Sequence, residues 1–582
     1  MSRYLSLILF IFFVKSLHSQ DVNEDIKTQQ IVVSKSYVPE LTNINKIRSI
    51  IASNDLIISK KVTVTYELIE TPVISSFKPN KASPLTLKRN KIDDYGLDSF
   101  IDLGIGSKDQ LTLDYTANYK IDRSQSVGLD ITSLNYGQVD KTIISSDESR
   151  FIFGINHIYS SQKMEVIHSV SIDQHNTNYY GIDTESTVLS DPLLLEKIIS
   201  GQKRKRLNVL SNWRFYNTYL KGARLDLNFI NDSYKSQEKS FEFKLDILIP
   251  VFRMNLLLVP KISYLNSSFN EDYFERNLIK SSYTKFESLI QIGNVEGELK
   301  YQFGARINYL LNKSNRSTDN FFVSPKLMIY YTGAGVKYQP YIDIDGGVKI
   351  NSYSEISNIN PYVAPSLNLV PTENSYNIRF GFKSFFDSGL EFNFGAHYKK
   401  EKNSIFFNRY AFDPTVLTQG YKLANSFGVQ YDNLIQYGLF GELLFNFNEE
   451  NLFKFILIQN KYDLDNISHP WNLPGVEGDI SLDLKVLKKL RINVSGRYIG
   501  TRPSVYRQVF LNQLPQDSSG DIRSLPSLTQ LKTEVNYKLA SRWIVYMRSQ
   551  FNIGVLNSKW DNYLLNKNLF LIGTRYGFDL KF

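Results

Sequence analysis

Residues 569–582 read LFLIGTRYGFDLKF, and this closing stretch shows the pattern that the rest of the chain repeats. Large side chains recur at every second position, and in a β-strand such positions share one face. The same alternation runs through QLTLDYTANY (110–119), FEFKLDILI (241–249), ELKYQFGARINY (298–309) and SLDLKV (481–486). Each stretch therefore predicts a strand with one apolar and one polar face.

Such strands fit two architectures, a soluble antiparallel sheet or a membrane barrel whose apolar face meets lipid. The connections between the predicted strands favour the barrel. If residues 425–447 form one strand, the pattern predicts about 22 strands, and every second connection is tight, as at residues 387–389. The connections between them are mostly long, at residues 183–204, 351–374, 402–424 and 501–526. Short turns at one end and long loops at the other are typical of outer-membrane barrels.

The composition excludes several other classes of protein. The 582 residues include no cysteine, which rules out disulfides, thiol nucleophiles and cysteine-ligated metals. Aromatic residues make up 14% of the chain, and we expect them in girdles where the barrel wall meets the lipid headgroups. The net charge of +9 is dispersed along the chain, so we predict no nucleic-acid partner.

Three regions are predicted along the chain. Residues 1–19 have the short basic start and apolar core of a secretory signal peptide, although an uncleaved anchor is an alternative. Residues 20–95 contain short strand-like pieces broken by prolines, and we expect a periplasmic segment that either stays outside the lumen or enters it. Residues 96–582 form the predicted all-β transmembrane antiparallel barrel, which places the protein in the cell outer membrane.

The last fifty residues or so carry a family resemblance. They resemble the closing strands of TonB-dependent receptor barrels at Leu556, Asn557, Lys559, Trp560, Tyr563, Gly573, Tyr576 and Phe582. A strand count near 22 also matches that class, whose lumen is normally plugged. The alternating end of the chain resembles the insertion signal read by the barrel-assembly machinery, which implies that role for Tyr576, Phe578, Leu580 and Phe582.

The resemblance fails at the other end of the chain. Residues 20–95 are too few and too interrupted for a receptor plug domain, and they resemble the N-terminal extension of plugless receptor-like barrels of Bacteroidota-type bacteria. Within them, IVVSKSYVPEL (31–41) can be read either as a TonB-type energy-coupling box or as a plain valine-rich strand.

Motifs for catalysis or metal binding are not recognisable, so we predict neither an enzyme, a cofactor nor a metal site. His397 falls on a polar strand face, and Asp343 and Asp345 are expected to meet lysine or arginine rather than a cation. Residues 190–206 predict a short loop helix with a basic end. Residues 501–516 carry side-chain types common at binding hot spots, although ordinary loop packing is the alternative for both segments.

Two functions remain open. In the first, the barrel serves uptake or passage of a solute, and polar side chains line the route: Lys300, Arg306, Arg379, Lys383, Glu391, Asp483, Lys485 and Arg497. In the second, the barrel is a scaffold that docks partners in an envelope complex. The expected partners are outer-membrane lipid, the barrel-assembly machinery, and TonB-type energy coupling or other envelope proteins. The resemblance favours the first function and the missing plug favours the second.

Overall fold

The computed structural model describes residues 99–580 except 140–141, 183–191, 274–276, 313–319, 334–336, 414–415, 417 and 506–521. The predicted signal peptide (1–19), the predicted N-terminal segment (20–95) and Phe582 lie outside the described residues. In the described part of the chain, no helix is long and apolar enough to cross a membrane.

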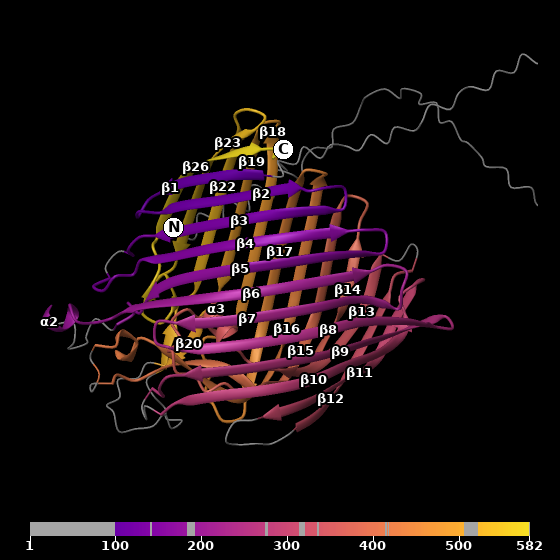
Figure 1. Cartoon of the computed structure of the whole chain (residues 1–582), viewed down its shortest axis with the longest axis horizontal. Coiled ribbons are helices and arrows are strands. Elements are labelled where there is room, and N and C mark those ends of the chain that lie inside the picture. Colours follow the sequence, from indigo (N-terminus) through magenta and orange to yellow (C-terminus); the bar gives the residue numbers. More distant parts are fainter. Residues whose placement is uncertain are drawn as a thin grey trace, which may run out of the picture. The chain divides into compact units, whose positions relative to one another are not determined.

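One antiparallel sheet of 22 strands dominates the structure (Figure 1). Its strands are β1 (Ser99–Gly106), β2 (Leu111–Lys120), β3 (Gln125–Tyr136), β4 (Glu148–Ser160), β5 (Met164–Asn178), β6 (Gly201–Phe215), β7 (Leu220–Asp232), β8 (Gln237–Val251), β9 (Met254–Phe269), β10 (Ile279–Asn294), β11 (Leu299–Asn312), β12 (Asn320–Tyr331), β13 (Tyr338–Lys349), β14 (Thr372–Phe385), β15 (Leu390–Arg409), β16 (Phe427–Asn448), β17 (Asn451–Leu464), β18 (Val476–Leu487), β19 (Leu490–Ile499), β22 (Leu528–Lys538), β23 (Trp543–Ile553) and β26 (Asn568–Phe578).

The sheet closes on itself. Its first strand, β1, pairs antiparallel with β2 on one side and with β26 on the other, from Ser99 opposite Phe578 to Gly106 opposite Leu571. Closure leaves no unpaired sheet edge, which a strand-built wall needs inside lipid. The predicted barrel is thus confirmed, and β16 runs unbroken through residues 427–448, which settles the strand count at 22.

The two ends of the barrel differ. Tight turns join β2 to β3, β4 to β5 and so on at the end we call the turn end, and the longer connections lie at the opposite, loop end. The loops carry α2 (Pro192–Leu195), α3 (Tyr353–Ile359), η2 (Gly420–Lys422), the pair β20 (Arg502–Val505) and β21 (Ile522–Leu525), and the pair β24 (Ser558–Trp560) and β25 (Tyr563–Leu564).

Apolar side chains face outward along the strands. On β11, for example, Phe303 is 49% exposed, whereas Arg306 on the other face takes part in contacts inside the barrel. Exposed aromatic residues gather near both strand ends: Tyr219, Phe252, Tyr338, Phe385 and Trp543 at the turn end, and Phe151, Phe321, Tyr376 and Phe570 at the loop end. This distribution is the one expected for a wall that meets two lipid–water interfaces.

Two predicted loop boundaries are wrong. The predicted helix over residues 190–206 shrinks to α2, because residues 201–206 already belong to β6 and pair with β5. The predicted loop at 402–424 begins later, since β15 continues to Arg409 after a bulge. Of residues 501–516, residues 502–505 form β20, and residues 506–516 lie outside the described residues.

A buried carboxylate stabilises the seam where β1 and β26, the first and last strands of the described sheet, pair. Asp102 of β1 is 1% exposed, and its carboxylate accepts hydrogen bonds from Nε of Arg575 of β26 (2.9 Å) and from Tyr546 of β23. It also forms an ion pair with Nη2 of Arg575 at 2.7 Å. Tyr546 reaches this position by lying over Gly573, where a Cβ would overlap its ring. The seam therefore combines backbone pairing with a buried charge network.

We predict that Asp102→Asn lowers the stability of the folded barrel by about 3 kcal/mol, because it leaves Arg575 without its buried counter-charge. Urea unfolding followed by the shift in electrophoretic mobility measures this. The control is Asp579→Asn, whose partner Arg542 lies 3.0 Å away in an ion pair with both side chains over 40% exposed, and whose loss should cost below about 1 kcal/mol. Equal effects from both variants would contradict the role of Asp102.

Candidate functional site

The connection between β13 and β14, residues 350–371, folds into the barrel interior, and we call it the inner loop. Its α3 residues Tyr353 and Ile356 are buried, as are Val363, Ala364, Leu367 and Leu369. At one side, Tyr283 of β10 donates a hydrogen bond to the carbonyl of Leu369 (2.8 Å), and at the other, Tyr431 of β16 donates to the carbonyl of Asn368 (3.0 Å). The loop also reaches the distant strand β6, where Arg204 donates to the carbonyl of Pro361 (2.7 Å), so it extends from β13 and β14 into the lumen.

A carboxylate from the barrel wall holds the start of α3. Glu238 of β8 is 1% exposed, and it accepts hydrogen bonds from the backbone N–H of Tyr353 (2.6 Å) and of Ser354 (3.1 Å). Ser267 of β9 donates a third hydrogen bond to it (2.6 Å). Free N–H groups at a helix start are well satisfied by a negative charge, so Glu238 fixes where the inner loop enters the lumen.

A second contact holds the Tyr353 side chain. Arg204 of β6 donates from Nε to the Tyr353 hydroxyl (3.1 Å) and from Nη2 to the carbonyl of Pro361 (2.7 Å). The Tyr353 hydroxyl in turn donates to Asp232 of β7 (2.8 Å). Burial raises the pKa of Tyr353 well above its usual value, so the phenol keeps the proton it donates.

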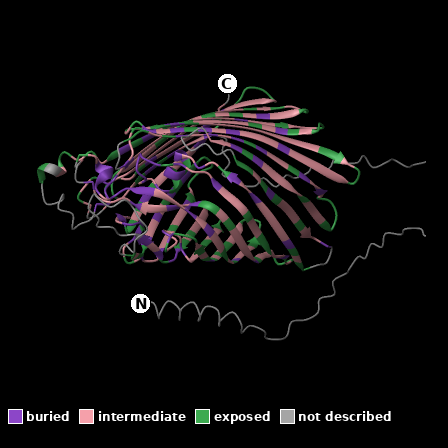
Figure 2. Ribbon diagram, turned by 90° about the horizontal axis from the view of Figure 1, so that it is seen from below, coloured by how far each residue is buried: buried purple, intermediate pink, exposed green. Residues whose placement is uncertain are grey.

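Other loops pack onto the inner loop and fill the loop end of the barrel. Tyr362 stacks on Tyr563 of β25 with ring centroids 3.4 Å apart, and Tyr179 donates to the carbonyl of Val363 (2.8 Å). Buried residues gather at this end of the barrel in Figure 2. Part of the aromatic content, predicted only for the lipid girdles, thus lies in a buried loop cluster: Tyr179, Tyr180, Tyr273, Tyr353, Tyr421 and Tyr563.

The packed loops also contain buried ion pairs. Arg409, at the end of β15, lies 3.1 Å from Asp561 of the β24–β25 connection, with exposed fractions of 4% and 1%. Lys422 of η2 is fully buried and lies 3.7 Å from both Asp413 and Glu271. Breaking such a pair leaves an unpaired charge in the protein interior, which is strongly destabilising. These contacts therefore hold the loops together.

Below the inner loop lies a cavity of about 920 Å³, between α3 and the inner wall from β4 to β14. Its lining has seven basic and six acidic side chains: Arg150, Arg206, Arg224, Lys261, Lys285, Arg306 and Lys349, with Asp173, Asp226, Glu242, Glu287, Asp345 and Glu355. We call it the charged cavity. Its size falls within the range of ordinary ligand pockets, but its lining is far more polar than is usual.

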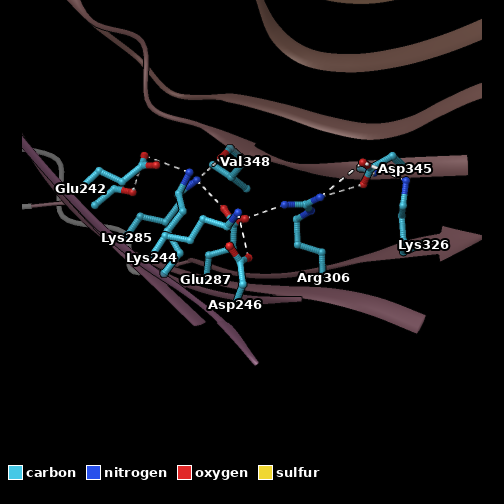
Figure 3. A network of polar contacts seen from close by, with 12 residues as sticks. Glu242, Lys244, Asp246, Lys285, Glu287, Arg306, Lys326, Asp345 and Val348 are labelled. Atoms are coloured by element: carbon cyan, nitrogen blue, oxygen red, sulfur yellow. Dashed lines mark hydrogen bonds and ion pairs between the residues drawn. The ribbon is translucent and has the colours of Figure 1, made fainter. Parts of the chain in front are cut away.

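Ion pairs link β10, β11 and β13 along this cavity (Figure 3). Arg306 of β11 donates to Glu287 of β10 (2.6 Å) and to Asp345 of β13 (3.1 Å). Lys285 donates to Glu287 (2.7 Å) and to the carbonyl of Val348 at the root of the inner loop (2.6 Å). The charged wall therefore contacts β13 two residues before the inner loop begins.

Acidic residues of β13 meet basic side chains, as the sequence predicts. Lys326 of β12 donates to Asp343 (3.0 Å) and to Asp345 (3.3 Å), and Arg306 contacts Asp345 as well. His397 shares a hydrogen bond with Asn460 (2.9 Å). Within the described residues, no group of three or more histidine, aspartate and glutamate side chains is placed to hold a metal ion.

Of the eight residues predicted to line the route, only Arg306 borders the charged cavity. Arg379 lies over Phe440, with its guanidinium carbon 4.5 Å from the ring centroid, and Lys383 lies 5.4 Å from the Tyr341 centroid. The register places Lys300 opposite Tyr330 and Glu391 opposite Phe385.

The remaining three lie on β18 and β19, away from the charged cavity. Asp483 pairs with Arg491 at 2.8 and 2.9 Å, Lys485 with Glu450, and Arg497 with Glu477 at 3.3 Å. The residues predicted from the sequence do not include Glu238 and Arg204, which hold the inner loop, or Lys285 and Glu287, which belong to the cavity wall. The alternation places these residues on polar strand faces, which is a signal for an interior position. It does not give their heights relative to residues on neighbouring strands, which decide the contacts.

Comparison with known proteins identifies other structures that have the same fold. Neither a protein-family model nor a curated protein matches the sequence. Among solved structures, the siderophore receptor PirA from Acinetobacter baumannii is similar over 82% of this chain and 80% of its own, at 11% identity and a TM-score of 0.60. The FrpB iron transporter from Neisseria meningitidis is similar over 82% and 81%, at 10% identity and a TM-score of 0.60.

The copper transporter OprC is similar over 82% of both chains, at 9% identity and a TM-score of 0.56. Identities this low establish the fold and not a shared ligand. The predicted outer-membrane barrel is confirmed at the level of the fold. The chain has the 22-stranded fold of TonB-dependent outer-membrane receptor barrels, which its closing strands resemble.

Proposed function

We propose that the protein serves passage of a polar solute across the outer membrane, and that the inner loop controls the route. The observation that carries this proposal is the charged cavity, which lies inside the barrel directly beneath the inner loop. Charged and polar side chains along a lumen can replace the water around a polar solute. The fold similarity to proteins named as siderophore, iron and copper carriers supports a transport role.

In this proposal the inner loop takes over closure of the lumen. It extends from β13 and β14 to β6 and β8, where Arg204 and Glu238 hold it, so a solute arriving from the loop end must displace it. Lys285 contacts Glu287 of the charged wall and the carbonyl of Val348, two residues before the loop begins. We propose that occupancy of the cavity affects the position of the loop through this side chain.

We propose the predicted partners as part of the same function. The outward face of β26 carries Tyr576, 4.9 Å from Trp543, and Phe578, 6.1 Å from Tyr115, between ring centroids at the turn end. These side chains suit contact with lipid headgroups and recognition by the barrel-assembly machinery, together with Leu580 and Phe582. Energy coupling through residues 31–41 stays a prediction.

A scaffold that docks other envelope proteins is the second candidate. The buried pairs of Arg409 with Asp561 and of Lys422 with Asp413 favour it, because they tie the loops into one packed body. Loops that never separate would leave no route for a solute. The two functions therefore differ in whether the inner loop can move.

We predict that the full-length protein shows little steady conductance in planar bilayers and that Glu238→Ala raises its open fraction about 30-fold. The substitution leaves two buried N–H groups of α3 unpaired, which costs about 2 kcal/mol, and this corresponds to roughly that change in population. Replacing residues 353–369 by a short glycine–serine linker should give a steadily open pore.

The matched control is Ile359→Ala. Ile359 lies on the same helix, is 52% exposed and does not line the charged cavity, so the open fraction should hardly change. An unchanged, closed barrel after the linker replacement would contradict closure by the inner loop. Recording a chain without residues 20–95 tests the predicted N-terminal segment, because openings that appear only then would assign closure to that segment.

Hydrogen exchange gives a second prediction for the same anchor. In Glu238→Ala, amides of residues 353–364 should exchange at least tenfold faster, while amides of β8 and β9 keep their protection. Mass spectrometry of peptides from the folded protein measures both regions at once. Faster exchange spread evenly over the whole barrel would show that Glu238 supports general stability instead of the inner loop.

A further inference from the structure

Three lysines lie on the outward face of the barrel wall near its loop end. Arg204 of β6 is buried in the interior, so the alternation of the strand turns its neighbours Lys203 and Lys205 outward, and both are exposed. On β8, Glu238 is buried in the same way, which turns the exposed Lys239 outward. Strands β6, β7 and β8 lie side by side (Figure 1), and we call these three lysines the outer lysine patch.

The charge on this part of the outer wall has one sign. The outward positions of β5–β10 carry no carboxylate, and Lys280 of β10 adds a fourth positive charge at the same end. The outward positions of β1–β4 carry no lysine, arginine or carboxylate. None of the four lysines has an ion-pair partner among the described residues. Positive charge is therefore concentrated on a few neighbouring strands, and the described part of the protein does not neutralise it.

A groove of about 380 Å³ lies within the patch on the outer wall. Lys205 and Lys239 line it, together with the exposed apolar side chains of Ile172, Leu207 and Phe229. In the sheet register, Ile172 lies opposite Leu207, and Phe229 lies opposite Lys239. The groove thus joins an apolar surface to two ammonium groups.

The two lysines lie at the loop-end edge of the apolar wall. Lys205 precedes the outward Leu207 on β6, and Lys239 precedes the outward Phe241 on β8, and both strands begin at the loop end. A lysine on the lipid face of a barrel is destabilising in the middle of the bilayer and close to neutral at the interface. In this position the methylene stem covers apolar surface while the ammonium group reaches the lipid headgroups.

From these observations we propose that the outer lysine patch binds a lipid of the surrounding leaflet whose phosphate-bearing headgroup has a net negative charge. Lys205 and Lys239 are two strand spacings apart, about 10 Å, and contact the phosphate from two sides. One acyl chain of the lipid lies in the groove over Leu207 and Phe229. A headgroup with its own ammonium group binds less well, because that group competes with the lysines for the phosphate. The inference depends on the barrel fold and not on whether the barrel passes a solute.

Competition between two lipids tests the proposal. The full-length protein in neutral detergent is equilibrated with equal amounts of dioleoylphosphatidylglycerol and dioleoylphosphatidylcholine, and native mass spectrometry counts the bound lipids. The anionic lipid should be bound about 25-fold more often, because each lysine near an anionic headgroup contributes about fivefold. Equal occupancy by the two lipids would overturn the proposal. Millimolar glycerol 3-phosphate should not displace the lipid, and displacement would assign the patch to free phosphate instead.

Substitutions locate the site. Lys205→Gln with Lys239→Gln should bring the preference close to one, whereas Lys205→Arg with Lys239→Arg should keep it. The control is Lys461→Gln on β17, because Lys461 also faces outward but lies outside the groove and has Asp463 on the same face. Heat-dependent electrophoretic mobility checks that each variant is folded. A preference that survives in the double glutamine variant, or that falls equally in the control, would contradict the assignment.

Discussion

The structure depends on one constraint, that every backbone N–H and C=O within lipid must be paired inside the protein. A closed antiparallel sheet meets it, and β1 and β26 complete the closure although they lie at opposite ends of the sheet in sequence. Closure forces each strand to present one face to lipid and one to the interior. On β11, Phe303 therefore faces outward and Arg306 faces the interior. Asp102 is buried on the inner side of the seam for the same reason.

A closed barrel of 22 strands encloses a wide interior. Protein segments or water must fill this space. Side chains of the wall are too short to fill it, and the inner loop extends into it instead. The cost of burying Glu238 and Arg204 is offset by the backbone and hydroxyl groups that these residues bind. The position of the inner loop also produces the charged cavity, because α3 lies over a part of the barrel wall that is lined with ion pairs. The position of the inner loop and the charged cavity thus have one structural origin.

Much of the fold could be predicted from sequence because the side-chain period of a strand is two residues and tight turns recur at one end. The alternation assigned Arg306 and Asp345 to polar faces correctly. It could not predict their contact, which depends on the stagger between strands. The inner loop lacked a signal for a different reason. Its anchor Glu238 is 115 residues from Tyr353, and no local pattern links them.

Spin labels at single cysteines along β11 test the central claim most directly, and the absence of natural cysteine makes such labelling clean. The claim is that residues 301–308 have one lipid face and one face in a polar lumen. It predicts that labels at Tyr301, Phe303 and Ala305 collide preferentially with oxygen, and labels at Gln302 and Arg306 with a water-soluble nickel complex. Alternation with the opposite phase, or no alternation at all, would contradict the account.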